Sequence, residues 1–333
     1  MRANGKVNWS RRGSTARLLL ATLALCATGA LHAQNGSAYP NRPIRFVVPQ
    51  PAGGTGDIVV RAVGQRLSER LGQPVVVENK PGAGGTLGAA FAAKAAPDGY
   101  TLVLASPGFS TFSAMYKGLS FNPATDFTPI GMMGTLPVLI VTRADAPYQK
   151  LSDFMAYARK NPGKAAFSSA GSGSLSHLLG AWFSSSTGLN LLHVPFAGTA
   201  PSLTAVVGGQ VDINFDPMAG AQLLKAGKIQ ALASTGERRS ELAPNVPTLT
   251  ELGIPVKGSV WLGVMAPAGL PPAIAERLSQ ELEATMKEPE LRARLLASGV
   301  QAEPMSAAEF ARFYQADTAN LTKLVHDNQV KVD

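Results

Sequence analysis

The sequence predicts an α/β fold with mainly parallel sheets, and three observations lead to this class. Two apolar, β-branched runs at 44–48 and 75–78 flank a segment with helical spacing, as in a strand, helix, strand unit. About 300 residues after the N-terminal leader exceed what one hydrophobic core usually supports, so two lobes are expected. Few aromatic residues, 7% of the chain, and abundant Ala, Gly and Val suit α/β layers joined by short turns.

The first helix is expected from Asp57 to Leu71, with Thr55 or Asp57 as its N-cap and Gly72 as its stop signal. Because this helix joins two strands of one sheet, the strands should be parallel and the crossover right-handed. In such sheets ligands bind beyond the carboxyl ends of the strands.

The remaining elements follow the same alternation. Further strands are predicted at 102–104, 138–141, 166–168, 211–215 and 230–233, and further helices at 151–160, 176–187, 201–208, 219–227, 272–287, 289–298 and 306–325. The last three helices have the most regular apolar spacing, and Ser306 with Glu309 forms a capping box. We expect these three helices to cover a sheet.

Residues 1–33 have the pattern of an export signal. Basic residues precede an apolar run at 18–27, and Leu31-His32-Ala33 suits cleavage. The run is shorter than the roughly 20 residues of a membrane span. The sequence therefore predicts export to the periplasm.

Removal of this signal changes the charge balance and the cysteine content. It carries five of the 30 Lys and Arg residues and no acidic residue, which leaves 25 basic against 22 acidic residues, a net charge of +3. The overall value of +8 thus gives no argument for nucleic-acid binding. Cys26, the only cysteine, lies within the export signal and is removed with it. Disulfides, thiolate metal sites and cysteine catalysis are therefore not expected in the mature chain.

Two glycine-rich turns, at 49–57 and 79–86, each follow an apolar run and lead into a helical segment. Such a turn lets backbone N–H groups approach an anion, which the helix dipole also favours. The spacing does not fit nucleotides: Leu87 stands where a dinucleotide fingerprint needs its third glycine, and no phosphate-binding lysine motif is present.

Two more turns of this kind lie in the middle of the chain, at 168–174 and 196–201. Gly198 or Thr199 could cap the helix that follows the latter turn. Two turns from the N-terminal half and two from the middle predict opposing lips of one cleft. Dipoles, hydroxyls and water could there bind a carboxylate without an arginine.

Catalytic and metal sites are not expected. Ser174 or Ser176 with His177 suggests a triad, but adjacent positions on a helix diverge by about 100°, and no GxSxG motif surrounds a serine. His177 is expected to cap or pack near its turn, with ligand contact as the alternative, and His193 to be structural. Two separated histidines without a HExxH pattern do not predict a metal site, and no cofactor is predicted.

Two acidic residues leave alternatives open. Asp57 either fixes the first turn as an N-cap or contacts the ligand. Asp216, which follows a strand and precedes Pro217, either orders a turn or receives a ligand ammonium group.

Ordered motifs along nearly the whole mature chain resemble the Bug family, the periplasmic solute-binding proteins of tripartite tricarboxylate transporters. They lie at 39–45, 53–61, 72–85, 96–102, 126–130, 176–178, 193–196, 208–212, 246–248 and 267–269. The resemblance implies a type II periplasmic-binding-protein fold with two lobes, 38–138 plus 262–333 and 139–261, that close on a ligand. It also implies a monomer that binds a small organic anion and delivers it to integral-membrane transporter subunits.

The family pattern carries a carboxylate site onto this chain. Its expected residues are Ala52, Gly53, Gly54 and Thr55, faced by Gly173, Ser174, His177, Gly198 and Thr199, with Ser106, Asp57 and Asp216 as further candidates. The ligand could be a di- or tricarboxylate, an aromatic carboxylate or an amino acid. Two alternatives stay open: a receptor for a membrane sensor, and a hydrolase that uses the same cleft.

The chain departs from the family pattern at two places. Gln50-Pro51 replaces a frequent aromatic and small pair, and Asn320-Leu321 stands where a tryptophan is frequent. The second change is expected to affect packing.

Overall fold

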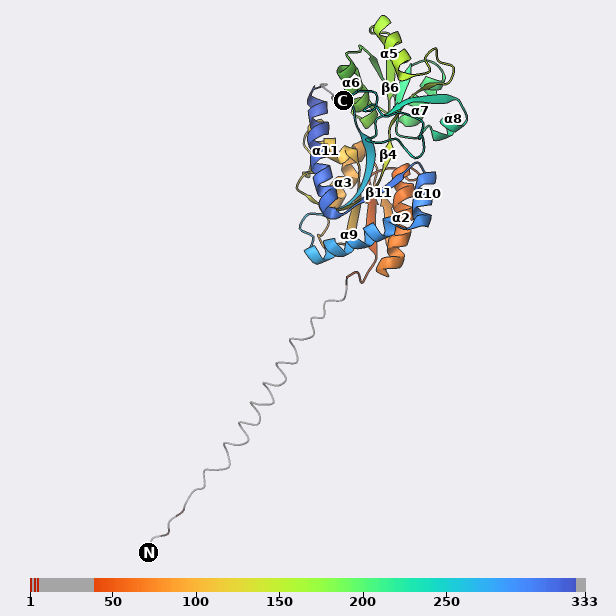
Figure 1. The fold of residues 1–333 in the computed structure, drawn as a ribbon. Helices are drawn as coiled ribbons and strands as arrows, with labels where there is room; N and C mark the ends of the chain where they lie inside the picture. The colour runs from red at the N-terminus through yellow and green to blue at the C-terminus, as the bar shows by residue number, and fades with distance from the viewer. Residues whose placement is uncertain (2, 4, 6–38, 328–333) are drawn as a thin grey trace. The chain divides into compact units, whose positions relative to one another are not determined.

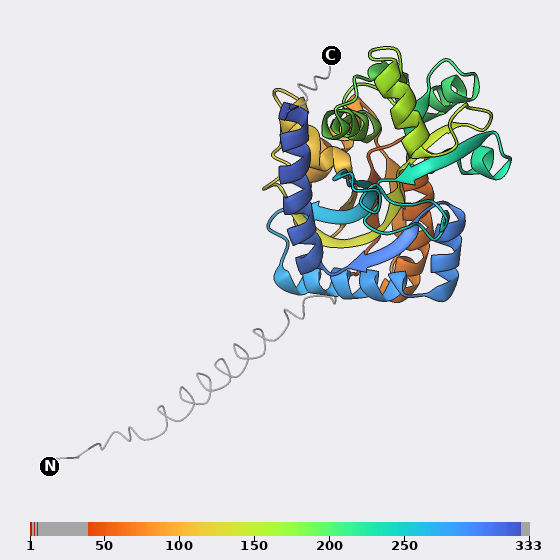
Figure 2. The same cartoon turned by 45° about the horizontal axis from the view of Figure 1, so that its top comes forward.

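A computed structural model describes residues 1, 3, 5 and 39–327, and the described residues from 42 onward belong to one compact unit. Two sheets, each flanked by helices, build this unit (Figures 1 and 2). This is the predicted α/β fold class. The export signal and its cleavage site fall almost entirely outside the described residues.

Sheet A has the strand order β11-β4-β10-β3-β1-β2. Its strands are β1 (Ile44–Val48), β2 (Val75–Asn79), β3 (Thr101–Ala105), β4 (Phe127–Pro137), β10 (Ser259–Pro267) and β11 (Gln301–Met305). β1 pairs in parallel with β2 and β3, as predicted. β10 lies antiparallel between β3 and β4, and β11 is antiparallel to β4.

Sheet B has the order β7-β6-β8-β5-β9. Its strands are β5 (Leu139–Arg143), β6 (Ala166–Ser169), β7 (Leu192–Pro195), β8 (Ile213–Asp216) and β9 (Ile229–Ser234). β6 is parallel to β7 and β8, whereas β5 runs antiparallel to β8 and β9. Four of the nine pairings described in the two sheets are parallel and five are antiparallel, so the prediction of mainly parallel sheets is wrong. Every antiparallel pairing involves β4, β5 or β10, the strands next to the points where the chain passes between the sheets, because no strand, helix, strand unit joins these strands to their neighbours.

The helices follow the strands closely along the chain. They are α2 (Thr55–Leu71), α3 (Thr86–Ala93), α4 (Pro107–Met115), α5 (Leu151–Lys160), α6 (Leu175–Thr187), α7 (Thr199–Val207), α8 (Ala221–Lys225), α9 (Pro272–Met286), α10 (Pro289–Ala297) and α11 (Ala307–Asp327), with a 3₁₀ turn at Ala83–Gly85. None of these described helices is long and apolar enough to cross a membrane.

Side-chain alternation builds the core of sheet B on both of its faces. Ile140 joins a cluster with Phe167 and Phe215, whereas its neighbours Leu139 and Val141 join a second cluster beneath α7. This period of two is what a central strand covered on both faces requires.

The core of sheet A lies beneath α3, α4 and α11, where Val103, Met132 and Trp261 pack with Phe109 and Phe310. α2 and α9 contact strands of the same sheet. α11, dark blue in both views, starts near α9 and extends to α6 of the sheet B region (Figures 1 and 2).

The chain crosses between the sheets twice. Val138 is the single residue between β4 and β5, and the return passes through Gly258 into β10. Thr235 connects the two crossings: its N–H donates to Val138 O at 2.9 Å, and its carbonyl accepts from Gly258 N at 2.9 Å.

Candidate functional site

The helices at the carboxyl edge of sheet A begin directly after its parallel strands. α2, the 3₁₀ turn with α3, and α4 follow β1, β2 and β3, respectively. Parallel strands end at one edge of a sheet, so these three helix N-termini share that edge. The first N–H groups of each helix have no acceptor within the helix.

Sheet B repeats the arrangement with α6, α7 and α8 after β6, β7 and β8. The N-cap of α6 is Ser174, whose Oγ accepts from His177 N at 3.3 Å. Gly198, one of the two residues predicted to cap α7, is its N-cap, at φ 117°, whereas Thr199 is the first residue of the helix.

A cavity of about 320 Å³ lies between elements of the two sheets. Its lining residues are Gly84, Pro107, Gly108, Thr111, Phe112, Met115, Tyr116, Ser172, Gly173, Ser174, Leu175, Leu178 and Leu321. The starts of α4 and α6 thus meet at one cavity, and none of these described lining residues carries a charge.

Two of the predicted site residues, Gly173 and Ser174, line this cavity. The structure does not bring the other candidates to it. Ala52, Gly53, Gly54 and Thr55 are exposed at the start of α2, and Ser106 serves as the N-cap of α4 beside the lining residue Pro107. Ligand contact by the first turn stays a prediction.

Asp57 organises the first turn, although it is not the N-cap. That position belongs to Gly54, so the prediction of Thr55 or Asp57 as N-cap is wrong. Asp57 is 3% exposed, and its Oδ2 accepts from Gly53 N at 2.9 Å and from Arg61 Nε at 3.0 Å. Asn79 donates to its Oδ1 at 2.9 Å, which ties the first turn to the end of β2.

These contacts decide the charge state of Asp57. Burial alone would raise its pKa, but the hydrogen bonds from Arg61, Gly53 and Asn79 and the charge of Arg61 outweigh burial. The pKa of Asp57 is therefore lowered, and the carboxylate is ionised at neutral pH.

Two stacked histidines support the third glycine-rich turn, at 168–174. His177 Nδ1 accepts from Gly173 N at 3.0 Å, and the His177 and His193 rings stack with centroids 3.8 Å apart. His193 Nε2 lies 2.7 Å from Ser169 Oγ, which in turn accepts from Gly171 N at 3.2 Å. Both histidines thus hold the backbone that leads to the cavity.

Burial lowers the pKa of His177. The pKa of His193 falls to about 4, first because of burial and second because His177 lies against it. Both rings are neutral at pH 7, so they can accept hydrogen bonds from the turn.

Asp216 orders the turn that follows β8. Its carboxylate accepts from Ala219 N at 3.0 Å and from Gly220 N at 2.9 Å. Burial raises its pKa to about 6, against the opposing effect of these two N–H groups. Of the two alternatives left open, the observed contacts are those of turn ordering.

The serine and histidine pairs lack the arrangement of a hydrolase. Ser174 Oγ donates to Gly171 O at 2.7 Å, and His177 Nδ1 is taken by Gly173 N. Ser169 does approach His193, but Ser169 has no exposed surface for a substrate to reach. The described residues also hold no group of three or more His, Cys, Asp or Glu side chains suited to a metal ion.

The sequence analysis did not predict helix α4, which forms one wall of the cavity. Pro107, Gly108, Thr111, Phe112, Met115 and Tyr116 line it, together with Leu321 from α11. A signal for α4 was present, because Ser106-Pro107 places an N-cap residue and an N1 proline directly after a buried strand. No local signal identifies Leu321, which lies more than 200 positions from α4.

A fold of two helix-flanked sheets, with helix starts of both sheets at one cavity, is that of two-lobed solute-binding proteins. Residues 59–330 match the family described as the tripartite tricarboxylate transporter family receptor. The chain belongs to this family.

Relatives with known names or structures agree with this assignment. BugT of Bordetella pertussis is 35% identical over 280 residues, covering 81% of this chain and 85% of BugT. The periplasmic binding protein BugD is 34% identical with a TM-score of 0.74, covering 88% of this chain and 100% of BugD.

Two similar structures from Rhodopseudomonas palustris contain ligands. One, solved with adipate, has 30% identity and a TM-score of 0.77 and covers 88% of this chain and 100% of its own. The other, MatC with bound malate, has 32% identity and a TM-score of 0.73 and covers 86% of this chain and 100% of its own.

Proposed function

We propose that this protein is a periplasmic receptor that captures a small carboxylated solute and delivers it to a tripartite transporter in the membrane. The observation that carries the proposal is the meeting of the α4 and α6 N-termini at one cavity without a charged lining side chain. Helix N-termini attract anions through their free N–H groups and their dipoles. The adipate and malate seen in related structures are carboxylates of the expected kind.

Ligand capture is expected to involve closure of the two lobes about the crossings at Val138 and Gly258. The sheet division supports lobes close to the predicted 38–138 plus 262–333 and 139–261, since β5 to β9 occupy 139–234 and form sheet B. The predicted boundary at 262 falls inside β10 of sheet A. A decrease in the radius of gyration on ligand addition, measured by small-angle X-ray scattering, would report closure.

A charge substitution tests the anion site directly. Ser172 is exposed and lines the cavity, so Ser172→Asp adds a negative charge with little risk to the fold. At about 6 Å and an effective dielectric constant of about 40, two like charges repel by about 1.4 kcal/mol, which is about tenfold in Kd. Ser172→Asn is the matched neutral control.

The measurement is isothermal titration of the mature chain with a panel of di- and tricarboxylates, aromatic acids and amino acids. We expect saturable binding without turnover, weakened by Ser172→Asp and retained by Ser172→Asn. Equal affinity in both variants, or strong binding of a neutral solute alone, would overturn the anion site. Ligand uptake by cells with and without the protein then separates a transport receptor from a sensor receptor.

A further inference from the structure

The cavity has two chemically different ends. Backbone and hydroxyl groups at the starts of α4 and α6, including Gly108, Ser172 and Ser174, form one end. Phe112, Met115 and Leu178 contribute apolar surface from further along the same helices. One end is thus suited to a carboxylate and the other to a hydrocarbon body.

Leu321 extends the apolar end from a third helix. It is 5% exposed and belongs to a cluster with Leu178 of α6, against which Met115 of α4 also packs. α11 contacts both α4 and α6, so Leu321 lies where helices associated with the two sheets meet. Leu321 itself lines the cavity.

The second glycine turn contributes to the wall near Tyr116. A Cβ built on Gly84 would lie 2.1 Å from Tyr116 Oη, and Gly84 has a φ of 64°. Only a glycine permits this close approach. Tyr116 and Gly84 therefore close the cavity beside α4.

A second carboxylate would be poorly accommodated at the apolar end. Transfer of an ionised group to an apolar surface without a charged partner is strongly unfavourable, and there the described lining residues offer it no cation, only the hydroxyls of Thr111 and Tyr116. A hydrocarbon group gains free energy from the same surface. A volume of about 320 Å³ is at the small end of the range for ligand sites, about 300–1,000 Å³.

We infer that the preferred ligand is a monocarboxylate with an apolar body, and that Leu321 is a specificity-determining residue for that body. The inference rests on the proposed function, because it assumes that the carboxylate binds at the starts of α4 and α6. It adds the class of ligand: one anionic group and a hydrocarbon chain or ring, in contrast to the dicarboxylates adipate and malate.

Two matched ligand series test the class. Kd is measured by isothermal titration for straight-chain monocarboxylates from propanoate to octanoate and for α,ω-dicarboxylates of equal carbon number. For the monocarboxylates we expect Kd to fall about three- to fourfold per methylene, the equivalent of about 0.8 kcal/mol, until the apolar end is full. A dicarboxylate should bind at least tenfold more weakly than the monocarboxylate of equal length.

Variants of Leu321 test its role in ligand specificity. Leu321→Asn should remove most of the gain in affinity per methylene, whereas Leu321→Met should retain that gain. Leu324→Asn is the matched control, because Leu324 belongs to the same cluster but does not line this cavity. If Leu321→Asn fails to fold, Met115→Gln on α4 makes the same test from the opposite wall.

The outcomes separate this inference from the proposed function. Carboxylate binding without chain-length dependence, or equal or tighter binding of dicarboxylates, would overturn the inference and leave the receptor function intact. Absence of binding by every carboxylate would overturn the proposed function itself. If Leu321→Asn and Leu324→Asn reduce the gain in affinity per methylene equally, Leu321 acts through helix packing, and its role in specificity is refuted.

Discussion

Asp57 illustrates how one buried carboxylate sets the shape of a glycine turn. Its oxygens accept from Gly53 N, from Arg61 and from Asn79, which joins the first turn to α2 and β2. We expect Asp57→Asn to lower the free energy of unfolding at pH 7 by about 1–3 kcal/mol, because charged hydrogen bonds are lost in a buried setting. Urea denaturation measures this change.

The same variant has a defined pH signature. The pKa of Asp57 is lower in the folded chain than its unfolded-state pKa of about 4. The stabilisation that the ionised carboxylate gives to the folded state is therefore fully present above about pH 4 and is lost as the pH falls through the folded-state pKa. The difference in the free energy of unfolding between wild type and Asp57→Asn should therefore become smaller near pH 3. Asp98→Asn, which removes an exposed pair with Arg42, should cost about 0–1 kcal/mol. Equal effects of the two substitutions would contradict the role given to Asp57.

The stacked histidines predict a loss of stability in weak acid. The pKa of His193 is lowered to about 4 in the folded chain, against about 6.5 when unfolded. The unfolded chain therefore takes up more protons between these values, and stability falls as the pH drops from 6.5 toward 4. His193 is half-buried, so we expect a loss of about 1 kcal/mol after allowance for solvent screening.

Urea midpoints of wild type and His193→Gln between pH 7 and pH 5 test this expectation. The glutamine amide retains a hydrogen-bonding group for Ser169 but does not titrate, so the slope of stability against pH should be smaller in the variant. Parallel slopes would show that other groups cause the acid sensitivity.

Elements with local signals were predictable from the sequence. Strand β1 and helix α5 have their predicted bounds, and the parallel pairing of β1 with β2 follows from the intervening helix. β4, β10 and β11 were missed. β4 contains Pro129, Gly131 and Gly134, which weaken a strand signal, and β10 pairs with strands more than 100 residues away in the chain.

The candidate site was predictable to a similar degree. The third turn, with Gly173 and Ser174, has a local pattern and does line the cavity. The apolar wall depends on α4, which lacked a predicted helix, and on α11, which arrives through tertiary packing. Local sequence patterns encode helix starts, whereas contacts between distant helices depend on the whole fold.

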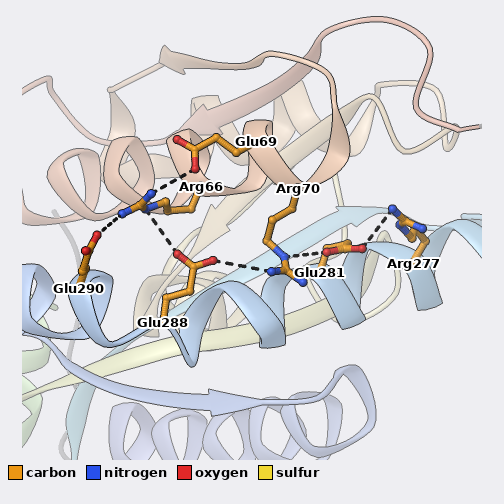
Figure 3. Close-up of polar contacts among 7 residues, drawn as sticks. All are labelled: Arg66, Glu69, Arg70, Arg277, Glu281, Glu288 and Glu290. Carbon is orange, nitrogen blue, oxygen red and sulfur yellow. Dashed lines mark hydrogen bonds and ion pairs between the residues drawn. The ribbon is translucent and has the colours of Figure 1, made fainter.

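A network of ion pairs connects α2 to the C-terminal helices (Figure 3). Arg66 contacts Glu288 at 3.4 Å and Glu290 at 2.7 Å, and Arg70 contacts Glu281 at 2.8 Å. The Arg70 and Glu281 side chains are 37% and 16% exposed, so the pair is partly shielded from solvent. The network joins parts of the chain more than 200 residues apart.

We expect Arg70→Met to lower stability by about 0.5–1 kcal/mol at low salt, with a smaller effect in about 0.5 M salt because mobile ions screen surface charges. Thermal unfolding at both salt concentrations measures the difference. Lys287→Met, which removes a more exposed pair within α9 and its C-cap, is the control and should have a smaller effect. If Arg70→Met lowers stability by the same amount at both salt concentrations, the loss comes from packing of the aliphatic part of the Arg70 side chain and not from its charge.

Packing and hydrogen bonds connect the elements of the two sheets. α11 covers the core of sheet A through Phe310 and packs on α6 through Leu321 and Leu324. Thr235 joins the two crossings by hydrogen bonds to Val138 and Gly258. Separate unfolding of either half would expose these shared apolar and hydrogen-bonded groups.

We therefore expect residues 42–327 to unfold in one cooperative transition. Amide hydrogen exchange in β1 of sheet A and β6 of sheet B, followed through a urea series, should give coincident midpoints. A bound carboxylate should raise both midpoints equally, because a ligand held between the α4 and α6 starts stabilises the folded state as a whole. Two distinct midpoints, or a ligand effect confined to one sheet, would contradict this coupling and would place the binding energy in a single half of the molecule.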